Sequence, residues 1–137
     1  MSHKTDVKTK LNNRDYVIKG LTNLGYKFEV AEIGKTLSTR GYYGNTKSNV
    51  DILITHTPDG ASTNNEIGMA LQADGSYVAT GDFYFTRGIS AQKLSNTLTV
   101  EAKKEEVNDR LMALGFQMES EFNETSQEVE YTFTRWS

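Results

Sequence analysis

The chain of 137 residues contains no cysteine. It therefore cannot form disulfides, use a thiolate nucleophile, or hold zinc or an iron–sulfur cluster through sulfur. No apolar run approaches the ~20 residues of a membrane-spanning helix, and the first residues contain no apolar signal segment. Only 36% of the residues are hydrophobic. We therefore expect a soluble, cytoplasmic protein in which residues 1–137 form a single domain with one economical core and no metal or cofactor.

Basic side chains are scarce in the second half of the chain. Residues 1–60 contain nine Lys/Arg and six Asp/Glu, whereas residues 61–137 contain six and twelve. The halves therefore carry +3 and −6, which sum to the net charge of −3. Such a chain lacks the basic footprint with which proteins contact nucleic-acid phosphates.

Two Leu-Gly dipeptides predict how the fold is organised. Gly25 and Gly115 each follow a stretch of helical periodicity and precede an alternating, strand-like segment. A glycine at this point supplies the left-handed residue that ends a helix. We therefore predict helices over residues 13–24, with Asn12 as N-cap, and over residues 100–114.

The remaining elements follow from turn signals and alternation. Pro58-Asp59-Gly60 and Asp74-Gly75 predict turns, residues 61–65 an exposed loop, and Ser90 a helix cap. A short helix and a bend near residues 97–99 precede the second main helix, one bent helix being the alternative. The expected strands are 3–10, 26–32, 50–56, 67–72, 77–85, 117–122 and 128–136. Together these elements predict an α+β fold in which both main helices cover one face of a single antiparallel sheet, in a ferredoxin-like or related arrangement.

One loop combines charge, aromatics and glycine. Arg40-Gly41-Tyr42-Tyr43-Gly44 would suit an anion or a partner surface, because guanidinium and tyrosine side chains provide charge and rigid contact area. Asp82 and Tyr84 lie in a second aromatic segment, Gly81–Phe85, and complete the predicted binding residues. We predict no catalytic or metal-binding residue. Trp136 is expected to be buried and to anchor the last strand.

Two alternatives remain open. Asp51 and Asp82 both border predicted strands and could form the carboxylate pair of a small enzyme or metal-dependent hydrolase. His3 and His56 lack the spacing of a metal-binding pair but could join such a site. In the second alternative, Tyr42, Tyr84 and Phe85 would stack single-stranded nucleic acid on an open sheet face, although the aromatic–basic motif of RNA-binding sheets is absent.

Several short motifs together resemble a family of unknown function encoded in cyanobacterial and algal plastid genomes and in cyanophages. The resemblance covers essentially the whole chain. It rests on Met1-Ser2-His3, Arg40-Gly41-Tyr42 with Gly44, Ile67-Gly68, Tyr77 with Asp82-Phe83, Gly115-Phe116 and Arg135-Trp136.

The chain departs from that family at three places. Lys4 replaces an aromatic, Asp82–Phe85 replaces an Asp-Phe-Trp-Gly-like segment, and Glu101–Lys104 replaces an Arg-Tyr-Ala-Tyr run. A divergent Asn/Thr-rich version of this kind would suit a phage-borne copy. The resemblance implies a plastid stroma or host cytoplasm as the compartment but no activity. The favoured hypothesis is a non-catalytic binding or regulatory module for a host protein or a small anionic ligand.

Overall fold

The computed structural model describes the backbone of residues 5–8, 11–41, 47–83, 86, 88–123 and 128–135, and the side chains of 11–41, 47–83, 86 and 88–115. The chain divides into two compact units, Met1–Ala102 and Lys103–Ser137. The fold is α+β with antiparallel sheets and two helices, as the sequence predicts. The predictions for Tyr42, Tyr43, Tyr84, Phe85 and Trp136 lie outside the described residues, as does that for His3.

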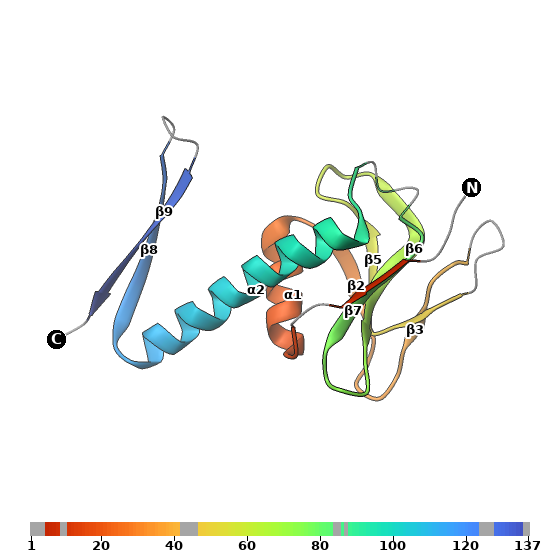
Figure 1. Ribbon diagram of the computed structural model, residues 1–137, viewed down its shortest axis with the longest axis horizontal. Coiled ribbons are helices and arrows are strands. Elements are labelled where there is room, and N and C mark those ends of the chain that lie inside the picture. The colour runs from red at the N-terminus through yellow and green to blue at the C-terminus, as the bar shows by residue number, and fades with distance from the viewer. Residues whose placement is uncertain are drawn as a thin grey trace. The chain divides into compact units, whose positions relative to one another are not determined.

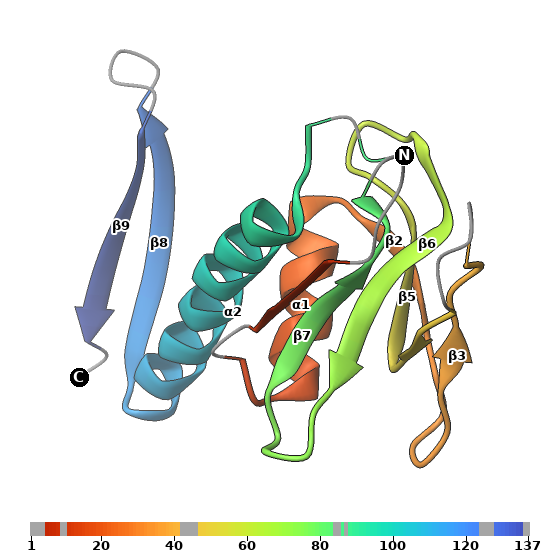
Figure 2. The ribbon, with the colours of Figure 1, turned by 45° about the vertical axis from the view of Figure 1, so that its right-hand side comes forward.

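A five-stranded antiparallel sheet is the centre of the first unit, in the order β1-β7-β6-β5-β2. Its strands β7, β6 and β5 lie side by side in Figure 2. A ferredoxin-like order is not confirmed, because four strands of this sheet come between the two helices along the chain. The strands are β1 (Thr5–Lys8), β2 (Lys27–Val30), β5 (Ile52–His56), β6 (Ser62–Leu71) and β7 (Tyr77–Gly81).

Helix α1 (Arg14–Leu24) has well-defined caps at both ends. Its N-cap is Asn13, whose side-chain oxygen accepts hydrogen bonds from the Asp15 and Tyr16 amides at 2.9 and 3.3 Å. The predicted cap, Asn12, is therefore wrong by one residue, because the oxygen that reaches these free amides is one position later. Gly25 ends the helix with φ +92°, as predicted.

Helix α2 (Ala91–Ala113) is continuous, so the prediction of two helices around a bend is wrong. The Ser90 hydroxyl caps it by accepting a hydrogen bond from the Lys93 amide at 3.0 Å, as expected. The Thr97 and Thr99 hydroxyls donate to carbonyls one turn earlier, at 2.9 and 2.7 Å. These polar residues therefore satisfy their hydroxyls within the helix instead of breaking it.

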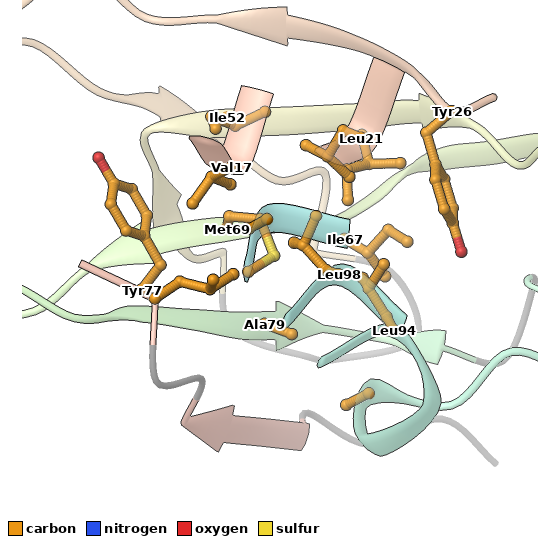
Figure 3. Close-up of a cluster of buried hydrophobic side chains, with 14 residues drawn as sticks. Val17, Leu21, Tyr26, Ile52, Ile67, Met69, Tyr77, Ala79, Leu94 and Leu98 are labelled. Atoms are coloured by element: carbon orange, nitrogen blue, oxygen red, sulfur yellow. The ribbon is translucent and has the colours of Figure 1, made fainter. Parts of the chain in front are cut away.

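The buried core joins side chains of both helices to residues of the sheet (Figure 3). The register pairs Ile52 with Met69 and Ile54 with Ile67, so these four residues share one face of the sheet. The helices also approach each other closely, since a β-carbon at Gly20 would lie 2.7 Å from the Leu98 side chain. The central members of the cluster are Val17, Leu21, Ile52, Ile54, Ile67, Met69, Tyr77, Ala79, Leu94 and Leu98.

A small two-stranded sheet, β3 (Leu37–Ser38) and β4 (Asn49–Val50), packs on the same unit. The fully buried Val50 lies against Gly68, where a β-carbon would be only 2.8 Å from the nearest Val50 methyl. Gly68 is therefore the point at which β4 approaches β6. Figure 1 labels β3 and β6 among the elements of this unit.

The C-terminal hairpin, β8 (Phe116–Asn123) and β9 (Glu128–Arg135), forms as predicted. It is a separate two-stranded sheet, so the prediction of one sheet for the whole chain is wrong. The prediction of a helix over 100–114 that covers the sheet implies that its apolar stripe, Val107, Leu111 and Leu114, is buried. This is also wrong, because Val107 and Leu114 are 44% and 67% exposed. At about 100° per residue, this stripe lies roughly half a turn from the stripe of Leu94 and Leu98. A helix that buries one of these faces leaves the other uncovered.

Candidate functional site

The segment at Arg40 is held against strand β6. The Arg40 amide donates to the Asn65 carbonyl at 2.8 Å, while the Arg40 side chain is exposed. The preceding residue, Thr39, is buried and its hydroxyl accepts a hydrogen bond from the Ser48 amide at 2.8 Å. A second bond, from the Thr39 amide to the Ser48 carbonyl, closes the base of the loop at 2.9 Å. The backbone of Arg40 is therefore fixed, and its guanidinium can reach a ligand from a rigid support.

Strand β6 is irregular where it meets Arg40. The register pairs Ile54 with Ile67 and His56 with Ser62, so β6 contains three more residues than β5 between these pairs. Asn64 and Asn65 both have left-handed backbones, with φ of +56° and +58°. The Thr63 hydroxyl, fully buried, donates to the Ile54 carbonyl at 2.6 Å and fixes the bulge. The predicted exposed loop over 61–65 is therefore mostly a bulged strand, and its buried Thr63 is what holds it in place.

Two buried carboxylates lie beside this bulge. Glu66 on β6 and Asp82 after β7 are only 1% and 3% exposed. The Asp82 amide donates to the Glu66 carbonyl at 2.9 Å, which continues the register that pairs Gly81 with Ile67. Burying a carboxylate is costly unless it is bonded. Both residues have interactions, but the buried Oε1 atom of Glu66 accepts no hydrogen bond from the described residues. Glu66 and Asp82 are therefore two buried acidic residues joined through the backbone beside the bulge.

A tight turn connects this pair to helix α2. The Thr86 hydroxyl lies 2.7 Å from the Phe83 carbonyl and 2.5 Å from the Ile89 carbonyl. The Ile89 amide donates to the Thr86 carbonyl at 3.2 Å. Phe83 also packs against the core.

Of the predicted site residues, Arg40 and Asp82 each bond to strand β6. Their amides donate to the carbonyls of the consecutive residues Asn65 and Glu66 respectively. Tyr42, Tyr43 and Tyr84, which complete the predicted set, lie outside the described residues.

Asp51 lies elsewhere in the sheet. Its amide donates to the Met69 carbonyl at 2.9 Å, and its carboxylate accepts from the Leu71 amide at 2.7 Å. The register therefore places Asp51 about four residues along β6 from the position of Asp82, a separation of roughly 13 Å along the strand alone. The half-buried His56 lies at the far end of β5 from Asp51, with its Nδ1 3.0 Å from the Thr55 hydroxyl. These three residues do not form a shared site.

Sequence reasoning missed Glu66 and the Asn64-Asn65 pair. A signal was present, since two consecutive asparagines tolerate the left-handed conformation better than other residues with side chains. Glu66 also lies two residues before Gly68, the residue that Val50 approaches closely. No local pattern, however, indicates that Arg40 and Asp82 converge on this segment.

Other features of the described residues offer little competing chemistry. No group of three or more His, Asp or Glu in the described part of the chain could hold a metal ion. An open groove of about 270 Å³ is lined by Leu24, Asn96, Thr97, Val100 and Glu101, none of them a predicted site residue. Neither helix, over the described ranges, combines the length and hydropathy of a membrane-spanning segment.

No protein-family model, curated protein sequence or solved structure matches the chain. The resemblance to the cyanobacterial and plastid family therefore stays a prediction.

Proposed function

We propose that the protein is a non-catalytic binding or regulatory module whose ligand-binding segment is Arg40–Gly41 and the adjoining bulge of β6. The observation that carries this proposal is the pair of backbone hydrogen bonds that joins Arg40 to Asn65 and Asp82 to Glu66. The segments of Arg40 and Asp82 are more than 40 residues apart in the chain. They nevertheless bond to two consecutive residues of the same strand, β6. An exposed guanidinium on a fixed backbone suits a host protein or a small anionic ligand.

The arrangement of the layers supports this location. We infer that both helices cover the same face of the five-stranded sheet, because their buried residues join one cluster with Ile52, Ile54 and their partners on β6. The small sheet of β3 and β4 lies against the other face at Gly68. Arg40 follows β3 directly, so its segment lies away from the helical layer.

The alternatives receive less support. An enzyme using Asp51 and Asp82 would need both carboxylates within reach of one substrate, and the register separates them. A nucleic-acid platform would need an open sheet face with exposed aromatics. Several described residues of that face are buried instead, among them Leu53, Val78 and Thr80.

Capture from a cyanobacterial lysate tests the proposal. Arg40→Ala combined with Tyr43→Ala should abolish specific capture of a host protein, while the thermal midpoint stays within a few degrees. Lys35→Ala is the matched control, because Lys35 is an exposed cation in another turn that pairs with Glu32 at 3.0 Å. Capture that survives in the double variant would place the site elsewhere, and unfolding of the variant would show a structural role.

Titration with inorganic phosphate tests the anionic-ligand version separately. Amide chemical shifts of Arg40 and Asn65 should move together on adding phosphate, since the two residues share a hydrogen bond. The shifts should disappear in Arg40→Gln and persist in Lys35→Ala. Equal shifts in both variants would show that the effect is one of general ionic strength.

A further inference from the structure

The second unit has one strongly apolar face and one acidic face. The register of β8 and β9 pairs Met118 with Phe133 and Phe122 with Val129. Because successive residues of a strand alternate between faces, one face contains all the large apolar residues of the hairpin. These are Phe116, Met118, Phe122, Val129, Tyr131 and Phe133, which share the face with Ser120 and, at its end, Arg135. The opposite face contains Glu119, Glu121, Glu128 and Glu130.

The hairpin cannot be stable through its strand pairing alone. A two-stranded sheet is marginal in water unless something covers its apolar face. The pairing of Glu121 with Glu130 makes it weaker still, since like charges directly opposite each other repel. The unit as a whole spans only residues 103–137, fewer than a chain normally needs for a core of its own.

Helix α2 adds exposed apolar side chains to this unit. Val107 and Leu114 lie on the stripe of α2 that faces away from the core, and they are 44% and 67% exposed. The stripe runs through Leu111 toward the first residue of β8. Because the stripe is exposed, it does not itself cover the hairpin.

Among the described residues of the first unit, four large hydrophobic side chains are exposed, and they belong to separate segments of the chain. They are Val30, Ile33, Leu71 and Val100. A second copy of this chain, by contrast, presents a surface of the same size and character as the hairpin face.

We propose that the second unit is a dimerisation element, in which the apolar hairpin faces of two copies pack against each other about a two-fold axis. At about 150 Å² for each Phe and Tyr, the four aromatic residues alone would bury roughly 600 Å² per copy and about 1,200 Å² in total. That area reaches the lower limit of stable interfaces, and Met118 and Val129 add to it. The same patch serves both copies, as a two-fold interface requires.

Charge explains why the assembly would stop at two copies. With the apolar faces joined, the four glutamates of each hairpin face water, and their mutual repulsion opposes the addition of a third layer. The same glutamates oppose docking of the hairpin on an anionic lipid surface. The proposed assembly is therefore a closed dimer.

Light scattering of the full chain over the micromolar range tests this proposal. The wild-type protein should have twice the 15.4 kDa mass of one chain. Phe133→Lys should weaken dimerisation about 100-fold or more, because it buries an unpaired charge in each copy. Thr132→Lys is the matched control on the acidic face, opposite Glu119, and should remain dimeric. A monomeric wild type, or equal behaviour of the two variants, would overturn the proposal.

A crosslinking measurement keeps the proposal testable if Phe133→Lys unfolds the hairpin. The chain has no cysteine, so a single introduced cysteine is a unique probe. Ser120, paired with Tyr131, lies at the middle of the apolar face, where a two-fold axis brings equivalent positions together. Ser120→Cys should form a disulfide-linked dimer on mild oxidation, and Glu121→Cys should not. Absence of the crosslink, or equal crosslinking of both variants, would overturn the proposal.

Discussion

Gly81 shows how a single residue controls the candidate site. It has φ +121°, and a β-carbon there would lie 2.0 Å from the Glu66 carbonyl oxygen. That oxygen also accepts the hydrogen bond from Asp82. The close approach of Asp82 to Glu66 therefore depends on the absence of a side chain at this position.

Gly81→Ala should lower the free energy of unfolding by about 2–4 kcal/mol, from backbone strain plus the clash with strand β6. Gly75→Ala is the matched control, since Gly75 has a similar positive φ of +86° but no atom within 4 Å of its β-carbon position. That variant should lose only about 1 kcal/mol. Chemical denaturation measures both values, and equal losses would show that the close contact has no energetic role.

Two buried tyrosines make the protein sensitive to alkaline pH. Burial raises the pKa of Tyr26, and burial together with the nearby Asp51 raises the pKa of Tyr77. The folded state therefore keeps protons that the unfolded chain releases near pH 10, so stability is full below about pH 10 and falls as pH rises above it. Tyr26→Phe with Tyr77→Phe should flatten this fall in unfolding free energy. An unchanged alkaline slope would contradict the assignment.

At the scale of elements, the two sides of helix α2 have different roles. Leu94, Leu98 and Ala102 are buried in the core, whereas Val100 on the opposite side is 67% exposed. The two apolar stripes have the same helical periodicity but different phase. The sequence pattern alone therefore marks both stripes as apolar without telling which one meets the core.

Leu98→Ala should cost about 2–5 kcal/mol of unfolding free energy, because the side chain is fully buried and leaves a cavity. Val100→Ala, two residues away in the same helix, should change stability by no more than about 0.5 kcal/mol. Thermal and urea unfolding of the two variants make the comparison. Similar losses at both positions would mean that the outer stripe is also covered in solution.

At the scale of the whole molecule, the hydrophobic core belongs to the first unit. Every residue of the buried cluster lies between Leu11 and Ala102. The second unit begins at Lys103, within α2, and contains the hairpin. Folding of the core should therefore not depend on the hairpin.

A chain that ends after Ala113 should unfold cooperatively, with a midpoint within a few degrees of the full protein at low concentration. It retains all of α2 and the complete buried cluster. Circular dichroism during heating measures the midpoint. Loss of cooperative unfolding would show that the hairpin stabilises the core directly.

Local chemistry made several features predictable from the sequence. Gly25 and Gly115 end their helices with φ of +92° and +91°, and Ser90 caps α2, because each acts on backbone groups only a few residues away. The hairpin at Asp74-Gly75 formed for the same reason, with the Gln72 amide bonded to the Ser76 carbonyl at 2.8 Å. In each case the contact that determines the local structure joins residues only a few positions apart in the sequence.

Tertiary structure alone decided the features that involve distant residues. The amides of Arg40 and Asp82 bond to the carbonyls of Asn65 and Glu66, so two distant segments contact consecutive residues of β6. Asp51, equally plausible from its sequence context, is directed to the other end of the sheet by the same register. The amino-acid sequence thus specified caps, turns and apolar stripes, whose energies are local. The pairing of strands decided which carboxylate lies next to the β6 segment that Arg40 contacts. The packing of α2 on the core decided which of its stripes is buried. Both depend on contacts between residues far apart in the chain.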